Sequence, residues 1–355
     1  MSGFNETALG AGDNTFPGTT ANDSVLGEGG NDSILGIGGN DILDGGADND
    51  TLDGGDGRDT LIGGAGSNRL FGGSGNDHII RGNDVGDNSL EGFLGTADIL
   101  DYSAVTANIT ASPTGATLAG LGNDTLGSIE VFRFGSGNDS FNGGSINPET
   151  ADGGAGDDTL LGASGSDSLA GGADNDLASY ANATGNVTVD LSAAQPRSFG
   201  ADGDDSLSSI ENVLGGVGND SIIGNDIANI LIGGAGNDTV LAGAGDDTLT
   251  GGLGDDSLVG GADNDLASYA NAAGNVTVDL IAGTSAGADG NDNLTGIENV
   301  LGGVGNDSII GNDIANILIG GAGDDTLTGG LGDDSLVGGA DNDLASYANA
   351  AGNVT

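Results

Sequence analysis

The chain contains 355 residues with a formal net charge of −49 at pH 7, 75 glycines, five basic residues (all arginine) and no cysteine. A surface this acidic argues against nucleic acid as a partner, because a phosphate backbone is bound through Lys and Arg side chains. No apolar run approaches the about 20 residues that a membrane span needs, so we expect no membrane span.

Residues 1–17 are expected to form an N-terminal cap, and they lack the basic and apolar segments of a cleaved signal peptide. Residues 18–80 then consist of seven tandem nonapeptides, such as GGDGRDTLI at 54–62. The template is Gly-Gly-x-Gly-x-Asp followed by x-apolar-x, and we number its positions 1 to 9. Glycine at positions 1, 2 and 4 suits a tight turn with φ > 0, and the apolar position 8 supplies the core.

The period of nine predicts the geometry. Six residues of turn reverse the chain and three residues of strand run back, so two nonapeptides should close one rung of a flattened spiral. Strands of successive rungs would then stack in parallel about 4.8 Å apart. The expected fold is all-β, a right-handed parallel β-roll (a β-solenoid) with two short-stranded parallel sheets.

The carboxylate at position 6 is the strongest functional signal. Calcium accepts carboxylate and backbone carbonyl oxygens at about 2.3–2.6 Å, and stacked turns would offer both. A solvated acidic turn is the alternative, but it does not explain why Asp holds position 6 while position 5 varies. Sites that use Asn68, Asn229 or Asn316 at position 6 should bind more weakly. The predicted calcium ligands are Asp23, Asp32, Asp41, Asp50, Asp59, Asp77, Asp158, Asp167, Asp176, Asp220, Asp238, Asp247, Asp256, Asp265, Asp307, Asp325, Asp334 and Asp343.

After Arg81 the template degrades, and longer inserts begin. DILDYSAVTANIT at 98–110 recurs as DLASYANATGNVTVDL at 176–191, and its tyrosine position is repeated in later modules. We interpret the inserts as longer, wider rungs, with each tyrosine filling a rung rather than binding a ligand. The expected organisation is a cap (1–17), a first repeat block (18–97), an insert with degenerate repeats (98–152), two blocks that each end in an insert (153–208 and 209–295), and a last block (296–355) that stops within the next insert. We therefore expect the chain to be a fragment of a longer protein.

The units GGDGRDTLI, GGAGDDTLL, GGAGNDTVL and GGLGDDSLV resemble the RTX (repeats-in-toxin, hemolysin-type) calcium-binding nonapeptide. The order of strand, IEN stretch and GGxGND resembles the β-roll region of serralysin-type metalloproteases. The family resemblance implies multiple Ca²⁺ ions between turns, export by the type I secretion machinery, and a secreted, extracellular location without a cleaved N-terminal signal.

Other chemistry finds little support in these residues. The glycine turns lack the Lys of a phosphate-binding loop, and His78 is the only histidine, so neither HExxH nor a catalytic triad is present. One apolar residue in nine cannot offset the entropy of ordering nine residues, so calcium binding and folding are expected to be one event.

We therefore expect a calcium-binding structural module that is not an enzyme. Two alternatives remain open: the accessory roll of a larger secreted protease, lipase or epimerase, and a repeat adhesin or surface-layer protein. These residues also leave open a surface or polysaccharide partner.

Overall fold

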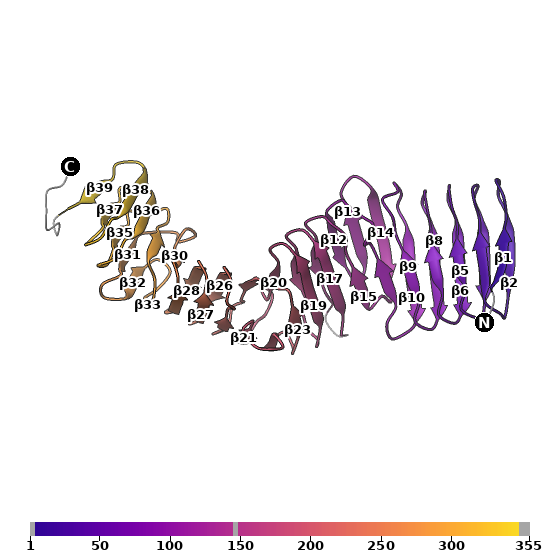
Figure 1. The fold of residues 1–355 in the computed structure, drawn as a ribbon, viewed down its shortest axis with the longest axis horizontal. Coiled ribbons are helices and arrows are strands. Elements are labelled where there is room, and N and C mark those ends of the chain that lie inside the picture. Colours follow the sequence, from indigo (N-terminus) through magenta and orange to yellow (C-terminus); the bar gives the residue numbers. More distant parts are fainter. Residues whose placement is uncertain (1–3, 145–147, 348–355) are drawn as a thin grey trace. The chain divides into compact units, whose positions relative to one another are not determined.

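The computed structural model describes residues 4–144 and 148–347, in which the chain forms thirty-nine β strands and no α helix. The chain divides into two units, Met1–Leu177 and Ala178–Thr355. Each unit is a stack of short strands in two sheets (Figure 1). The part of the chain that the structure describes contains no helix long and apolar enough to cross a membrane.

In the N-terminal unit, strands alternate between two sheets along the chain except in residues 109–127, where three consecutive strands lie in one sheet. The first sheet stacks, in spatial order, β1 (Asn5–Ala8), β3 (Asp23–Leu26), β5 (Ile42–Asp44), β7 (Thr60–Ile62), β9 (His78–Ile80), β11 (Ile99–Asp101), β15 (Val131–Arg133), β17 (Thr150–Ala155) and β19 (Ser168–Ala173). The second sheet stacks β2 (Thr15–Thr19), β4 (Ser33–Ile37), β6 (Thr51–Asp56), β8 (Arg69–Ser74), β10 (Ser89–Leu94), β14 (Gly122–Gly127), β13 (Gly115–Leu118), β12 (Ile109–Ser112), β16 (Ser140–Asn142) and β18 (Thr159–Leu161).

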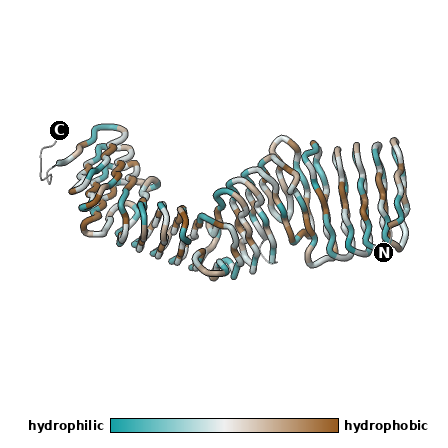
Figure 2. Tube along the Cα trace, viewed as in Figure 1, coloured by the Kyte–Doolittle hydropathy of each residue, from teal (hydrophilic) through white to brown (hydrophobic). Residues whose placement is uncertain are grey.

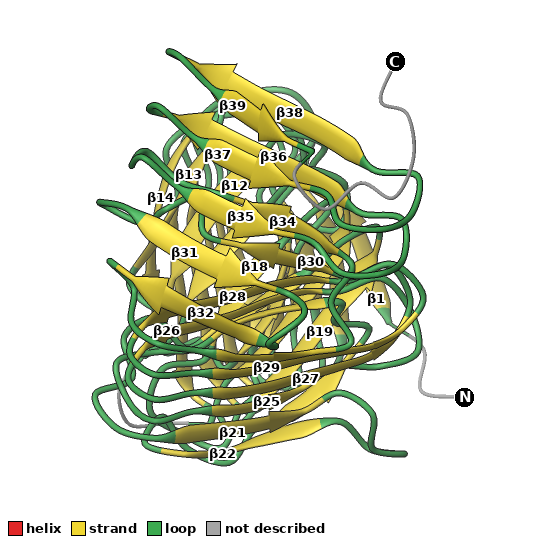
Figure 3. Ribbon diagram, turned by 90° about the vertical axis from the view of Figure 1, so that its left-hand side faces the viewer, coloured by secondary structure: helices red, strands yellow, loops and turns green. Residues whose placement is uncertain are grey.

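The C-terminal unit repeats this plan, and Figure 3 shows β25, β27 and β29 side by side in one of its sheets. That sheet contains β23 (Ser206–Ser208), β22 (Arg197–Gly200), β21 (Val187–Asp190), β25 (Ser221–Ile223), β27 (Thr239–Ala244), β29 (Ser257–Ala262), β33 (Asn293–Thr295), β32 (Thr284–Gly287), β31 (Val276–Asp279), β35 (Ser308–Ile310), β37 (Thr326–Thr328) and β39 (Leu344–Ser346). The other contains β24 (Asn212–Leu214), β26 (Ile230–Ala235), β28 (Thr248–Leu253), β30 (Leu266–Ser268), β34 (Asn299–Leu301), β36 (Ile317–Ala322) and β38 (Ser335–Ala340), while β20 (Leu177–Ser179) lies at the division between the units.

The register confirms the predicted rung. Ser24 of β3 pairs in parallel with Ile42 of β5, and Ile42 pairs with Thr60 of β7, so each rung contains eighteen residues. Position 8 is buried in most of the regular repeats: Leu43, for example, has 0% of its surface exposed, whereas Ala345 in the last described rung is exposed. Figure 2 shows the resulting alternation of apolar and polar residues along the stacked strands. The two-sheet parallel β-roll is therefore confirmed.

The inserts differ from the expected wide rungs because the chain reverses direction within them. In the N-terminal unit, β12 pairs antiparallel with β13 and β13 with β14, so the three form a meander. The meander is part of the same stack of strands. Its strand β14 pairs in parallel with β10, and its strand β12 pairs in parallel with β16. In the C-terminal unit, β31, β32 and β33 make the same arrangement between β29 and β35.

The turn glycines serve two different purposes, which corrects the expectation of φ > 0 at positions 1, 2 and 4. Positive φ occurs at positions 2 and 4, as at Gly55 (96°) and Gly57 (147°), but not at the position-1 glycine Gly54. In some turns a non-glycine residue at position 2 or 4 keeps this conformation, as at Ile37 (78°) and Asp48 (77°), but Asn225 and Ile227 do not. At Gly54 and most other position-1 glycines the surrounding atoms leave no space for a side chain, as described below.

Candidate metal centre

Position-6 aspartates of successive rungs form a continuous ladder through one oxygen of each carboxylate. The backbone N–H of Asp23 donates to Oδ1 of Asp41 at 2.7 Å, and that of Asp41 donates to Oδ1 of Asp59 at 2.7 Å. Because these bonds join residues eighteen apart, they tie each turn to the turn below it. The predicted ligands that accept such a bond from the preceding rung are Asp32, Asp41, Asp50, Asp59, Asp77, Asp158, Asp167, Asp176, Asp220, Asp238, Asp247, Asp256, Asp265, Asp307, Asp325, Asp334 and Asp343.

The second carboxylate oxygen, Oδ2, is buried and has no protein hydrogen-bond donor in most of these turns. An ionised buried oxygen without a partner is costly unless a cation or a proton compensates it. The predicted ligands whose buried Oδ2 has no hydrogen-bond partner among the described residues are Asp32, Asp41, Asp50, Asp59, Asp77, Asp158, Asp238, Asp247, Asp256, Asp265 and Asp325.

In several of these turns Oδ2 lies beside a backbone carbonyl from the next rung, in a space kept open by the position-1 glycine, whereas the turn of Asp247 has Ala242 at position 1. A methyl group on Gly54 would lie 2.4 Å from Oδ2 of Asp59 and 2.6 Å from the carbonyl oxygen of Gly72. The same pair of oxygens recurs in the C-terminal unit, where a methyl group on Gly233 would lie 2.3 Å from Oδ2 of Asp238 and 2.7 Å from the carbonyl of Gly251. A side chain at position 1 would fill this oxygen-lined space.

The carboxyl groups of the ladder hold their protons more tightly than ordinary aspartates. Burial, followed by the negative charges of Asp77 and Asp41, raises the pKa of Asp59 from 3.8 to about 7. Burial likewise raises the pKa of Asp256 to about 7 and that of Asp238 to about 6, with neighbouring rungs contributing in each case. No positively charged side chain is among the groups that set the pKa values of these three carboxyls.

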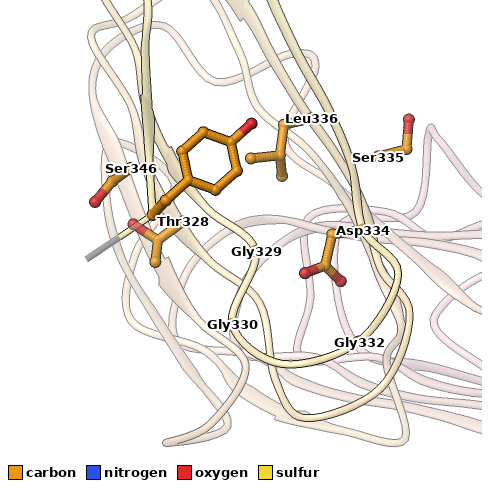
Figure 4. A pocket seen from close by; sticks show the side chains of 9 residues that line it. Thr328, Gly329, Gly330, Gly332, Asp334, Ser335, Leu336 and Ser346 are labelled. Atoms are coloured by element: carbon orange, nitrogen blue, oxygen red, sulfur yellow. The ribbon is translucent and has the colours of Figure 1, made fainter. Parts of the chain in front are cut away.

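Several predicted ligands depart from this pattern. In Asp220 and Asp307, Oδ2 accepts the N–H of the position-2 glycine of the same turn, at 2.8 and 2.7 Å. Asp23 accepts bonds from Asn5 and Thr19, which lower its pKa although burial opposes them. Asp334 is half-buried and Asp343 exposed, on the last rungs that the structure describes. Even so, the carboxylate of Asp334 points into its own glycine turn (Figure 4).

Asparagine at position 6 supplies the hydrogen-bond donor that aspartate lacks. The Nδ2 group of Asn229 donates to the carbonyl of Glu211 at 2.6 Å, and that of Asn316 donates to the carbonyl of Glu298 at 2.7 Å. In Asn68, Nδ2 donates to the carbonyl of Gly64 at 3.2 Å. The side-chain amides of these turns are hydrogen-bonded within the protein, and weaker calcium binding at these turns stays a prediction.

Position 5 forms a second ladder that the sequence analysis missed. Its side-chain oxygen accepts an N–H from the following rung, the opposite direction to position 6. Oδ1 of Asn219 accepts the N–H of Asn237, and Oδ1 of Asp246 accepts that of Asn264, at 3.0 and 2.9 Å. Both Asn and Asp can serve because only one oxygen is used, which explains why these two residues exchange at this position.

The sequence analysis also missed three buried acids in turns where the sequence departs from the repeat template: Asp98, Asp139 and Glu149. Each has one buried oxygen with no hydrogen-bond partner among residues 4–144 and 148–347. Asp139 follows Gly137-Asn138 and could have been found from this residual Gly-x-Asp pattern. Asp98 lies six residues after Gly92, and Glu149 lies six residues after Gly143, whereas a regular turn has five. The nine-residue template therefore does not identify them.

The inserts contain a different arrangement, in which protein donors satisfy the acid. The hydroxyl of buried Tyr269 donates to Oδ2 of Asp292 at 3.0 Å, and Ser285 Oγ donates to the same oxygen at 2.6 Å. In the first insert, Tyr102 donates to Oδ2 of Asp124 at 3.1 Å. The expectation that the insert tyrosines fill rungs is confirmed for these buried side chains.

The donor set suits calcium better than a transition metal. Among the described residues, no group of three or more His, Cys, Asp or Glu side chains converges. Each turn instead offers carboxylate and carbonyl oxygens, the ligands that calcium prefers, and no nitrogen or sulfur. His78 lies outside these turns and is half-buried, and its Nε2 lies within hydrogen-bond distance of Oδ2 of Asp101, at 2.9 Å.

Comparison with protein families agrees with this geometry. The model of the RTX calcium-binding nonapeptide repeat matches nine overlapping segments that together cover more than half of the chain. These segments are residues 9–43, 17–52, 44–79, 53–86, 147–178, 199–240, 214–249, 232–267 and 310–345. No curated protein matches the chain.

Proposed function

Because the chain belongs to the RTX calcium-binding nonapeptide repeat family, we propose that it is a structural module whose folding is driven by several Ca²⁺ ions bound in its turns. The observation that carries this proposal is the row of buried Oδ2 atoms without a donor, of which Asp59 is an example. A cation beside each oxygen supplies the missing positive charge, and the carbonyl of the next rung supplies a further ligand.

The turns then couple binding to folding. The oxygens of one candidate site come from two rungs, as with Asp238 and the carbonyl of Gly251. Neither half forms a site alone, so an ion stabilises only the stacked arrangement. Each filled site also orders the edge on which the next rung stacks. Binding should therefore be cooperative.

We further propose that calcium acts as a switch for export. Extracellular calcium modules have dissociation constants of about 10⁻⁴–10⁻³ M, far above the calcium concentration of a resting cytosol. The chain stays unfolded inside the cell, passes through the type I secretion machinery, and folds outside. The family membership and the unpaired carboxylates support this order of events.

The proposed role is structural rather than catalytic, because the regular turn acids are accounted for by the calcium ladder. The module then serves as the scaffold of a secreted protein, either a repeat adhesin or a protein that carries an enzyme domain elsewhere. The identity of residues 210–236 with residues 297–323 favours the repeat adhesin.

The test is a calcium titration of the whole chain by circular dichroism and small-angle scattering. In EDTA the chain should be expanded with little strand signal, and millimolar Ca²⁺ should induce strand signal and compaction with a steep midpoint. Mg²⁺ at the same concentration serves as the control, because it prefers a rigid octahedral site and should not replace calcium. A fully compact roll in EDTA would refute the proposal.

A further inference from the structure

Asp98 lies where the repeat has been lost from the sequence, yet it occupies a turn of the repeat type. Residues 92–98 contain one residue more than a normal turn and lie outside every segment that matches the family. Even so, Phe93 has a φ of 71°, the conformation that other turns adopt at position 2. The turn therefore accommodates the extra residue and keeps the backbone conformation of a regular repeat at position 2.

The carboxylate of Asp98 has the same environment as the regular ladder. Its exposed fraction is 0%, and its Oδ1 accepts the N–H of Asp77 at 2.8 Å. Its Oδ2 is buried with no hydrogen-bond partner in the part of the chain that the structure describes. Asp98 therefore has the unpaired, inward oxygen that characterises the predicted calcium turns.

Two backbone carbonyls surround this carboxylate from adjacent rungs. A methyl group on Gly92 would lie 2.1 Å from the carbonyl oxygen of Ser128 and 2.5 Å from Oδ2 of Asp98. A methyl group on Gly95 would lie 2.4 Å from the carbonyl of Gly75 and 2.5 Å from each oxygen of Asp98. The turn thus gathers oxygens from the rung before and the rung after, in space that only glycine leaves open.

The acidic ladder also continues past Asp98 on this edge of the roll. Oε2 of Glu130, in the next rung, accepts the N–H of Asp98 at 2.9 Å, where a regular rung would use an aspartate. Asp77, Asp98 and Glu130 therefore form three successive acidic rungs, and the ladder is not interrupted where the motif disappears.

The opposite edge of the same rungs is neutralised instead. There Asn68 donates its N–H to Asn88, and Asn88 donates to Oδ1 of Asp124. Oδ2 of Asp124 accepts the Tyr102 hydroxyl and lies 3.5 Å from Nε of the buried Arg81. Protein donors therefore compensate the acid on this edge, while nothing comparable reaches Oδ2 of Asp98.

We propose that the turn at residues 92–98 is an additional calcium site, held by Asp98 together with the carbonyls of Gly75 and Ser128. This inference rests on the proposed calcium-driven function and extends the ladder beyond the recognisable repeats. On one edge of these rungs calcium is bound at Asp98, while on the other edge protein donors satisfy Asp124, so the ladder continues past Asp77 into the first insert.

The first test compares Asp98→Asn with Asp87→Asn in the whole chain, using isothermal titration with Ca²⁺ and measurement of bound calcium after desalting. Asp87 is an exposed position-5 acid whose Oδ1 accepts the N–H of Asn123 at 2.8 Å, and asparagine keeps that acceptor. Asp98→Asn should bind one calcium ion fewer than wild type, and Asp87→Asn should bind the wild-type number. An unchanged number in Asp98→Asn overturns the inference.

The second test uses the wild-type chain, so it does not depend on the folding of a variant. Anomalous diffraction from calcium-loaded crystals should show an ion between Asp98 and the carbonyl of Ser128. Ions at Asp59 and Asp77 without one at Asp98 would overturn this inference alone. Ions at none of the three would instead contradict the proposed function.

Discussion

The backbone N–H of Asp238 donates a hydrogen bond of 2.7 Å to Oδ1 of Asp256, one rung further along the roll. Each of these aspartates thus uses Oδ1 to hold the stack together, while its Oδ2 is buried without a donor. One oxygen serves the fold and the other is available to a cation. Asparagine would preserve the first role and remove the charge needed for the second, and this separation can be tested.

Replacing Asp238 by asparagine should weaken calcium binding without breaking the ladder. The loss of one charged ligand, worth about 1.5–3 kcal/mol, should raise the calcium concentration at the folding midpoint by roughly 10- to 150-fold at the affected sites. Calorimetric titration gives both the midpoint and the number of ions bound. The matched control is Asp246→Asn, which removes an exposed charge and keeps the Oδ1 that accepts the N–H of Asn264. Equal midpoints in the two variants would mean that the ladder does not bind the ion.

Without calcium, the roll should be more stable at pH 5 than at pH 7.5. The pKa values of Asp59, Asp158 and Asp256 are raised from 3.8 to about 7 by burial and by neighbouring acids. Between pH 4 and 7 the folded state therefore binds more protons than the unfolded state, so its stability falls as pH rises through this window. Circular dichroism in EDTA at the two pH values should show more strand signal at pH 5.

Calcium should reverse this dependence because the ion and the proton compete for the same oxygens. The affinity for Ca²⁺ should rise between pH 5 and 7.5, as measured by titration at fixed ionic strength. An affinity that does not change across this range would show that the groups with raised pKa are not the calcium ligands.

Replacing Asn316 by aspartate should create a calcium site. The Asn316 side chain faces Gly311, where a methyl group would lie 2.3 Å from the carbonyl oxygen of Gly329, so the oxygen-lined space already exists. Aspartate loses the donor to the carbonyl of Glu298, and the variant should be less stable in EDTA but bind one more ion. Asn306→Asp adds the same charge at an exposed position-5 residue and should leave the number of ions unchanged. Bound calcium counted after desalting decides between these outcomes.

The regular part of the roll was predictable because sequence spacing alone determines it. The period of nine gives the eighteen-residue register seen between Ser24 and Ile42, and it places Leu43 in the core. The aspartate at position 6 marks the turn that we propose to bind calcium for the same reason. The sequence could not show which carboxylates are already satisfied, because Asp220 meets its donor, the N–H of Gly216, only through the local shape of its turn.

The inserts were not predictable in the same way. Their chain reversal depends on antiparallel pairing, such as Ile109 with Leu118, which no repeat period specifies. The position-5 ladder was also hidden, because Asn and Asp serve it equally and so give no fixed residue pattern. Asp98 was missed because one extra residue displaced it from the period, although its turn keeps the same geometry.

The first insert should be the most ordered part of the N-terminal unit without calcium. Phe132 is fully buried, with its ring centroid 4.9 Å from that of Phe141 and 6.4 Å from that of Phe134, and Tyr102 stacks on Phe134 at 6.3 Å. This cluster buries far more apolar surface than the single Leu or Ile of a regular repeat, and the nearby Asp124 needs no cation. In EDTA, amide hydrogen exchange across residues 98–142 should therefore be slower than across residues 18–80.

Phe132→Ala should remove this difference, since truncating a buried aromatic ring costs about 3–5 kcal/mol. Exchange across residues 98–142 should then match that of the regular repeats in EDTA, and more calcium should be needed to fold the N-terminal unit. Phe199→Ala is the control, because Phe199 is 40% exposed and lies in the C-terminal unit. Equally fast exchange in residues 98–142 and 18–80 of the wild-type chain would show that the aromatic cluster does not form before calcium binds. The roll would then depend on the ion in the insert as much as in the regular turns.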